Sequence, residues 1–198
     1  MNISVTLNGK KTVFEAQSEE SLMSVLHNKT SAHVKCGCLQ GFCGACTVLL
    51  NNEPVAACKL PVGIIRNAEI ITLDYFEKTE EYNNIIKGFA KAGIQLCGYC
   101  DAGKIFTAYK ILSLNKKVSR EEISDYVKFL APCCTDLDTL VNGILFALVI
   151  QSKNNSNIRQ STRTNKRWKL YYMQKIYMNY YFKYKIIQEY KLLVVAQD

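Results

Sequence analysis

The strongest constraint on the fold of this chain is a glycine-rich stretch, residues 36–58, that holds five of its nine cysteines. Four of these cysteines follow the spacing C-x4-C-x2-C, with the last one after 11 further residues. This spacing is the plant-type [2Fe–2S] pattern, in which four thiolates converge on two iron ions. The candidate metal ligands are Cys38, Cys43, Cys46 and Cys58.

Glycines between these cysteines favour the same interpretation. Gly37, Gly41 and Gly44 would let the backbone approach a cluster, adopt positive φ and point N–H groups at its negative charge. We therefore interpret the three glycines as cofactor-binding residues. The midpoint between Cys46 and Cys58 is residue 52, within the turn sequence Asn-Asn-Glu-Pro. A hairpin folded there would return Cys58 to Cys46.

Other interpretations of this cysteine group are a zinc site and a set of buried, reduced thiols. Zinc motifs usually pair two C-x2-C knuckles, and only one is present here. Cys36 is expected to be a non-ligand near the cluster, with replacement of Cys38 as the alternative. His27 and His33 are expected in surface or loop positions, because cysteines already fill the whole motif.

A second cysteine group lies in the C-terminal half. Cys97 and Cys100 form a C-x2-C pair, and Cys133 and Cys134 follow after 32 residues. Both pairs fall at ends of predicted helices. A helical hairpin returns its end near its start, so the two pairs are expected to meet. Helix N-termini at this point would direct partial positive charge at an anionic cluster.

The apolar periodicity predicts an α+β fold. A hairpin, a helix, a second hairpin and a strand are expected at residues 2–16, 18–29, 47–58 and 68–74. From residue 80 the period becomes helical, which predicts four helices in a compact bundle at residues 81–97, 104–115, 119–131 and 135–151. The candidate N-caps are Ser18, Asp101, Ser119 in a capping box with Glu122, and Thr135 or Asp136.

Charge and composition divide the chain near residue 152. Residues 1–152 contain 15 Lys/Arg and 15 Asp/Glu, whereas residues 153–198 contain 10 Lys/Arg, two acidic residues and seven of the 12 tyrosines. Together with the change to helical periodicity near residue 80, these counts predict domains at 1–76 and 77–152 and a basic aromatic tail at 153–198. The tail could bind nucleic acid or an anionic membrane, form an interaction helix, or be an aberrant C-terminus; the last is favoured, so no nucleic-acid partner is expected.

The N-terminus lacks the apolar core of a secretory signal. The longest apolar run, residues 140–150, is interrupted by Asn142 and Gly143 and is too short for a membrane span. We therefore expect a cytoplasmic protein in which thiols stay reduced and clustered cysteines bind metal.

Two motifs together resemble a known family. The sequence Gly-Phe-Cys-Gly-Ala-Cys-Thr-Val-Leu-Leu at 41–50 and Cys-Gly-Tyr-Cys at 97–100 are similar to the small iron–sulfur subunit of the molybdenum hydroxylases, the xanthine dehydrogenase family. The resemblance covers about residues 2–151. It implies a β-grasp ferredoxin-like domain followed by an all-α four-helix-bundle domain, each with one [2Fe–2S] cluster. The second cluster would be held by Cys97, Cys100, Cys133 and Cys134.

The resemblance also implies a role. A large partner subunit would hold molybdopterin and oxidise the substrate, for which a purine is the family's commonest association. The helical-domain cluster would lie nearer the molybdenum, and the other cluster would pass electrons on, usually to FAD in a medium subunit. This chain would be the electron-transfer subunit of an oxidoreductase complex, without catalytic residues of its own.

Departures from the family pattern concentrate around the second group. The family usually has C-x-C before Thr, whereas this chain has Pro132-Cys133-Cys134. Either Cys133 supplies the missing thiolate, which needs a sharp backbone bend, or the cluster has three thiolates. Leu96, preceded by Gln95, stands where a pterin-contacting Gln is usual. In addition, Asp101-Ala102-Gly103 replaces Thr-Pro-Gly.

The first group departs less, with Leu39 and Gln40 in place of a Gly and an acidic residue. The departures leave two alternative functions: a stand-alone ferredoxin-like carrier with one cluster, and a decayed relative whose second cluster is lost.

Overall fold

The computed structural model describes residues 1–114, 116–130 and 133–154. The predictions for Pro132 and for the tail from residue 155 onward lie outside these residues. Residues 1–151 form one compact unit, and the fold described below is that of this unit.

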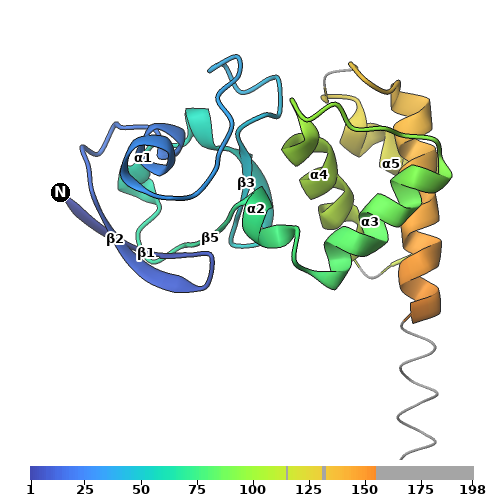
Figure 1. Cartoon of the computed structure of the whole chain (residues 1–198), viewed down its shortest axis with the longest axis horizontal. Coiled ribbons are helices and arrows are strands. Elements are labelled where there is room, and N and C mark those ends of the chain that lie inside the picture. Colours follow the sequence, from blue (N-terminus) through green and yellow to red (C-terminus); the bar gives the residue numbers. More distant parts are fainter. Residues whose placement is uncertain (115, 131–132, 155–198) are drawn as a thin grey trace, which may run out of the picture. The chain divides into compact units, whose positions relative to one another are not determined.

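A five-stranded mixed sheet forms the N-terminal part, with the order β2-β1-β5-β3-β4 (Figure 1). The strands are β1 Asn2–Leu7, β2 Lys10–Glu15, β3 Thr47–Leu50, β4 Glu53–Ala56 and β5 Glu69–Ile71. Strand β1 pairs parallel to β5, and all other neighbours are antiparallel. The sheet and the helices that follow it confirm the predicted α+β class.

Both hairpins turn through paired positive φ angles. Asn8 and Gly9 have φ values of 50° and 77°, and Asn51 and Asn52 have 50° and 67°. Positive φ at both central residues is characteristic of the two-residue type I′ turn, which matches the twist of the flanking strands. The second hairpin leads directly into a short 3₁₀ helix, η1 Ala57–Lys59, which carries Cys58.

Helix α1 Leu22–Lys29 packs its buried face, Leu22, Val25 and Leu26, against the sheet. Its N-cap is Ser21, which accepts from the Ser24 N–H at 3.2 Å, so the prediction of Ser18 was wrong. The reason is that residues before Ser21 pair with the chain around Pro61: the Ser18 carbonyl accepts from Gly63 N–H.

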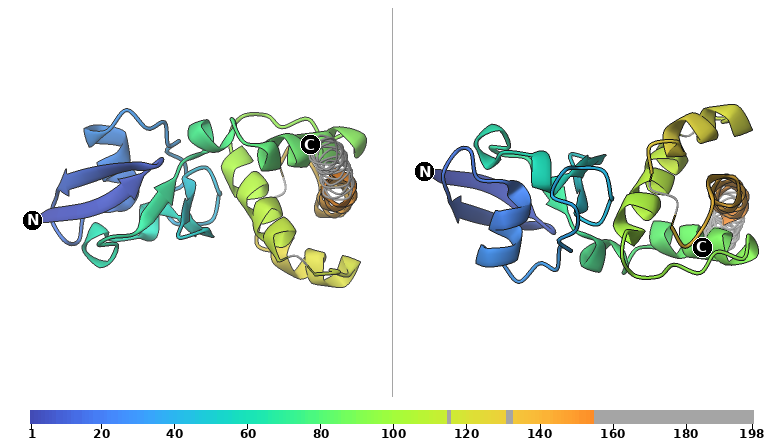
Figure 2. Two further views of the ribbon diagram at one scale, coloured as in Figure 1. Left: turned by 90° about the horizontal axis from the view of Figure 1, so that it is seen from below. Right: turned by 90° about the horizontal axis from the view of Figure 1, so that it is seen from above.

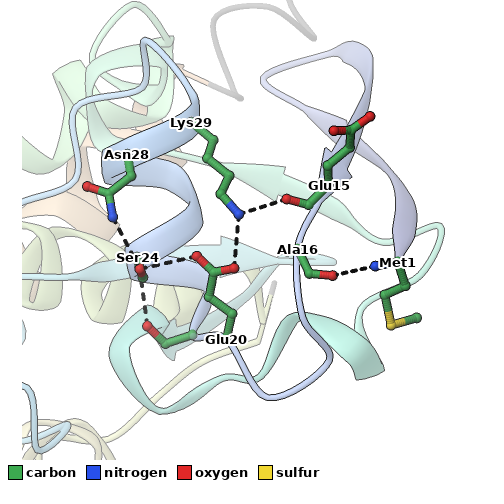
Figure 3. A network of polar contacts seen from close by, with 8 residues as sticks. Met1, Glu15, Ala16, Glu20, Ser24, Asn28 and Lys29 are labelled. Carbon is green, nitrogen blue, oxygen red and sulfur yellow. Dashed lines mark hydrogen bonds and ion pairs between the residues drawn. The ribbon is translucent and has the colours of Figure 1, made fainter.

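The far end of α1 is held to the first hairpin by polar contacts (Figure 3). Lys29 Nζ donates to the Glu15 carbonyl at 2.7 Å and to Glu20 Oε2 at 3.0 Å. The N-terminal ammonium of Met1 donates to the Ala16 carbonyl at 2.7 Å. The bond from Lys29 to Glu15 therefore ties the end of α1, where the cysteine loop begins, to β2, and the Met1 bond joins the start of β1 to the residue after β2.

The short helix α2 Leu73–Phe76 leads into the helical part, which contains α3 Glu80–Lys91, α4 Asp101–Ser113, α5 Arg120–Val127 and helical residues 137–151 (Figures 1 and 2). Buried residues of these segments share one core, which includes Phe89, Phe106, Ile123 and Ile144. None of the helices in the described part of the chain has the length and apolar character needed to cross a membrane.

Two of the four predicted helix caps are confirmed. Ser119 and Glu122 form the expected capping box at α5, and Asp136 Oδ1 accepts from the Thr139 N–H at 2.8 Å. Asp101 is not the N-cap of α4: it is the first helical residue, and its Oδ1 instead accepts from the Gly98 N–H at 3.2 Å. That contact tightens the turn between Cys97 and Cys100.

Candidate metal centres

The first cysteine group is assembled by the loop after α1 and by the β3–β4 hairpin. Cys38 and Cys43 lie in the loop, Cys46 lies directly before β3, and Cys58 lies in η1. The Ala57 N–H donates to the Cys46 carbonyl at 3.2 Å, so the hairpin returns its end to its start. The predicted return of Cys58 to Cys46 follows from this pairing.

Backbone amides point at the sulfurs of this loop. The N–H groups of Gln40 and Cys43 each donate to Cys38 Sγ at 3.4 Å, and the Cys38 N–H donates to Cys43 Sγ at 3.3 Å. Amide hydrogen bonds to sulfur stabilise thiolate charge and are one of the means by which proteins tune iron–sulfur clusters. The backbone amides of the loop therefore already point at the sulfurs that would carry negative charge as thiolates.

Two glycines of the loop lie where a side chain would collide. A Cβ at Gly37 would lie 2.5 Å from Cys43 Sγ, and a Cβ at Gly44 would lie 3.2 Å from the Cα of Gly103. Gly44 and Gly41 also have positive φ, 77° and 85°. Gly41 and Gly44 thus have the predicted positive φ, and Gly37 has the predicted close approach to a cysteine sulfur. The cofactor-binding role itself stays a prediction.

The thiols of the first group differ in acidity. The amides of Gln40 and Cys43 lower the pKa of Cys38 to about 6, whereas burial raises the pKa of Cys46 to about 11. Neighbouring thiolates repel one another, so a cation is needed to offset their charge. A metal centre would supply that cation and displace the remaining protons.

The spread of the first group argues against a single ion. In the part of the chain that the structure describes, only Cys97, Cys133 and Cys134 form a metal-type set with all ligand atoms within 4.8 Å of one another. A tetrahedral zinc site needs all four sulfurs about 2.3 Å from one centre. The wider first group fits a two-iron cluster better.

The second cysteine group gathers at the N-terminal end of α4. Cys97 and Cys100 lie in the turn before α4, and Cys100 is its N-cap residue. Cys100 Sγ lies 3.2 Å from Cys133 Sγ, and the sulfurs of Cys97, Cys133 and Cys134 lie within 4.8 Å of one another. The structure therefore brings both predicted pairs together, and their ligation of a metal stays a prediction.

Adjacent Cys133 and Cys134 both reach this site because the chain bends at residues 133–135. The hydrogen bond with Cys100 lowers the pKa of Cys133 to about 6, while burial raises the pKa values of Cys100 and Cys134. The sharp bend that a four-thiolate site required is thus present in the described residues.

Lys104 is a site residue that the sequence reasoning missed. It lies one helical turn after Cys100, is 1% exposed, and its Nζ lies 2.8, 3.4 and 3.9 Å from the sulfurs of Cys100, Cys133 and Cys134. Burial acts to lower the pKa of Lys104, but the contacts with the cysteines outweigh it and raise the pKa. The i, i+4 spacing from Cys100 was the available signal.

The two cysteine loops contact each other. Lys35 Nζ of the first loop donates to the Gly98 carbonyl of the second. A Cβ on Gly37, which would lie beside Cys43 Sγ, would also lie 3.1 Å from the Tyr99 hydroxyl oxygen. Tyr99 stands between Cys97 and Cys100, so these contacts connect one candidate centre to the other.

Other predicted residues lie at the surface. Cys36, His27 and His33 are exposed, and His27 and His33 thus occupy the surface positions that the sequence predicted. Leu96 packs against the core of the helical part, and Gln95 beside it is exposed. The residue directly before Cys97 is therefore a partly buried leucine, and the exposed glutamine lies one position earlier.

The donor chemistry of both sites fits iron–sulfur clusters: four thiols each, amide or ammonium donors on the sulfurs, and glycines where the backbone comes close. The fold and these two sites define a two-centre iron–sulfur protein built for electron transfer.

Comparison with known proteins supports the same class. Two domain families match: a 2Fe–2S iron–sulfur cluster binding domain at residues 5–63 and a [2Fe–2S] binding domain at residues 72–145. The nicotinate dehydrogenase small FeS subunit of Eubacterium barkeri is 34% identical over 125 residues, 63% of this chain and 80% of the relative.

Two further relatives cover most of their own length. The xanthine dehydrogenase iron–sulfur-binding subunit of Escherichia coli O157:H7 is 29% identical, over 73% of this chain and 92% of the relative. A chain of quinoline 2-oxidoreductase from Pseudomonas putida 86 matches in structure with a TM-score of 0.65 at 29% identity, covering 77% of this chain and 96% of that one. The chain belongs to the [2Fe–2S] iron–sulfur subunits of the molybdenum hydroxylases.

Proposed function

We propose that this chain relays single electrons through two [2Fe–2S] clusters, from the molybdenum site of a partner subunit to FAD or another acceptor. The observation that carries the proposal is the direct contact of the first cysteine loop with the second site: Lys35 contacts Gly98 of the second loop, and Gly44 contacts Gly103 in the first turn of α4. Electron transfer between two centres needs them held close and rigidly. A shared loop interface provides this within one chain.

The ligand sets that we propose are Cys38, Cys43, Cys46 and Cys58 for the first cluster, and Cys97, Cys100, Cys133 and Cys134 for the second. When bound, such clusters take up and release one electron each, so two of them can carry away a two-electron oxidation in single steps. The chain's own residues hold, shield and electrostatically tune the clusters.

The predicted domain boundaries are part of the proposal. We propose a β-grasp ferredoxin-like domain at 1–76 and a four-helix domain at 77–152, formed by α3, α4, α5 and the helical segment from residue 137. The two matched domain families, at 5–63 and 72–145, support a division between them. The shared core of the four helical segments supports the second domain.

The relatives are subunits of larger complexes, which supports partner subunits for this chain. We propose a molybdopterin-binding large subunit and an FAD-binding medium subunit. A xanthine dehydrogenase-like complex is the finer assignment, supported by the iron–sulfur subunit of that name in Escherichia coli. We place the complex in the cytoplasm, because the thiols that serve as ligands must stay reduced.

The decisive experiment is iron counting with EPR on the full chain, reconstituted anaerobically and reduced with dithionite. Two distinguishable signals and about four irons per chain are expected. The variants Cys43→Ser and Cys134→Ser should each lose a different signal. One signal and about two irons, lost only in Cys43→Ser, would instead indicate a one-cluster carrier or a decayed relative.

One observation favours a different occupant of the second site. The compact set of Cys97, Cys133 and Cys134, with sulfurs within 4.8 Å, would also suit a single tetrahedral ion such as zinc. Metal analysis separates the two cases. About two irons with about one zinc per chain, the zinc lost in Cys134→Ser, would establish a structural zinc site and end the two-cluster proposal.

A further inference from the structure

The helical part of the chain buries one lysine at the second cysteine site. Lys104 is 1% exposed, and its ammonium contacts the sulfurs of Cys100, Cys133 and Cys134. Among the residues that the structure describes, no carboxylate forms an ion pair with it. The cysteine sulfurs are therefore its counter-charge.

A buried ammonium is costly unless an anion offsets its charge. Neutral thiols would not do so, but thiolates bound to iron would, because a thiolate-ligated [2Fe–2S] cluster is anionic. The position of Lys104 thus suits the site when it holds a cluster, and the lysine in turn stabilises the negative charge of that cluster.

The first site is arranged differently. The hydrogen bonds to Cys38 Sγ and Cys43 Sγ come from backbone amides of the same loop. Lys59, the neighbour of Cys58, is exposed, so water screens its charge. The full charge of a buried ammonium therefore acts on the second site, whereas the partial charges of backbone amides act on the first.

Reduction adds one electron, and therefore one negative charge, to a cluster. A fixed positive charge on its sulfurs stabilises the reduced form more than the oxidised form, and net charge and sulfur hydrogen bonds are known determinants of cluster potential. We propose that Lys104 is a positioning and tuning residue, whose ammonium raises the reduction potential of the second cluster. This inference rests on the proposed function.

The test is an EPR-monitored redox titration of the reconstituted full chain, with dithionite as reductant. Lys104→Met removes the charge and keeps an unbranched side chain of similar length, and Lys104→Arg retains the charge. Lys87→Met removes one charge at an exposed position of α3 and is the matched control.

In Lys104→Met, the reduced-to-oxidised ratio of the second cluster at a fixed potential should fall at least tenfold, which corresponds to a midpoint lowered by about 59 mV for one electron. The first cluster should keep its midpoint in every variant. Lys104→Arg and Lys87→Met should both resemble the wild type. An unchanged second midpoint in Lys104→Met would overturn the proposal.

Loss of the second cluster from Lys104→Met is also informative. If Lys104→Arg then retains the cluster, the positive charge is needed to hold it, which supports the proposal. If both variants lose it, the site needs the shape of lysine, and the role of the charge is overturned. The wild-type titration separates these cases from failure of the proposed function, because a wild type without a second signal has no second cluster to tune.

Discussion

Gly44 and Gly103 meet backbone to backbone, so that a Cβ added to Gly103 would lie 3.0 Å from the Cα of Gly44 and 3.2 Å from its carbonyl oxygen. Gly44 belongs to the first cysteine loop and Gly103 to the first turn of α4. The contact therefore joins the two parts of the chain beside both candidate centres. Any side chain at either position would push them apart.

Gly103→Ala tests this contact. Alanine in place of glycine usually stabilises a helix by up to about 1 kcal/mol. Here the added methyl would meet rigid backbone, and we expect a loss of about 1–3 kcal/mol in the free energy of unfolding. Urea denaturation of the reconstituted protein measures this change.

Thr107→Ala, on the same helix, is the control for Gly103→Ala and should change the unfolding free energy by less than about 1 kcal/mol. A Gly103→Ala variant as stable as the wild type would show that the two backbones do not need to approach this closely.

Gly37→Ala should damage the first centre selectively. Its Cβ would lie 2.5 Å from Cys43 Sγ, so the sulfur would have to move away from the other thiols. We expect the first EPR signal to be lost or strongly weakened and the second signal to persist. Cys36→Ala changes the exposed neighbouring residue and should keep both signals. Retention of a full first signal in Gly37→Ala would contradict the packing described here.

Leu39 holds a backbone conformation that suits glycine, with φ of 57°. A left-handed conformation costs an L-residue roughly 1–2 kcal/mol. The Leu39 side chain is 51% exposed, so little packing offsets that cost. Leu39→Gly should therefore unfold at higher urea than Leu39→Ala, with a difference of about 1 kcal/mol in the free energy of unfolding. Equal midpoints for the two variants would show that this conformation carries no strain.

The sequence allowed the secondary structure near the first centre to be predicted well. The alternation of residues 2–15 and the turn Asn8-Gly9 were sufficient for β1 and β2, because a two-residue turn fixes the register of its hairpin. The spacing of Cys46 and Cys58 likewise located the second hairpin. Both hairpins depend on residues close together in the sequence, so the sequence around each turn is sufficient to predict them.

Tertiary contacts account for what the sequence did not reveal. Ser18 and Ser21 are equally good caps on propensity alone, and only the pairing of Ser21 with Pro61 selects between them. Lys104 resembles any helical lysine until α4 turns its side chain inward onto sulfurs from residues 133 and 134. The contact of Gly44 with Gly103 joins segments 59 positions apart, which no spacing rule addresses.

The adjacent cysteines give the last prediction. An extended chain would point neighbouring side chains in opposite directions, but the bend at residues 133–135 turns the sulfurs of Cys133 and Cys134 to one site. Cys133 Sγ lies 3.2 Å from Cys100 Sγ and 3.4 Å from Lys104 Nζ. These distances are why we propose Cys133 as a ligand of the second cluster. Cys133→Ala should therefore lose the second EPR signal and lower the iron content from about four to about two per chain.

Cys36→Ala is the matched control for Cys133→Ala, because it removes an exposed thiol outside both proposed ligand sets and should retain about four irons. If Cys133→Ala also retained about four irons and both signals, the second cluster would be held by the remaining three thiolates, and Cys133 would only neighbour it. A partial result is equally clear, since a second signal with shifted g values would mean that another atom has replaced the Cys133 sulfur. In either of these cases the bend at residues 133–135 would serve to position Cys134 alone.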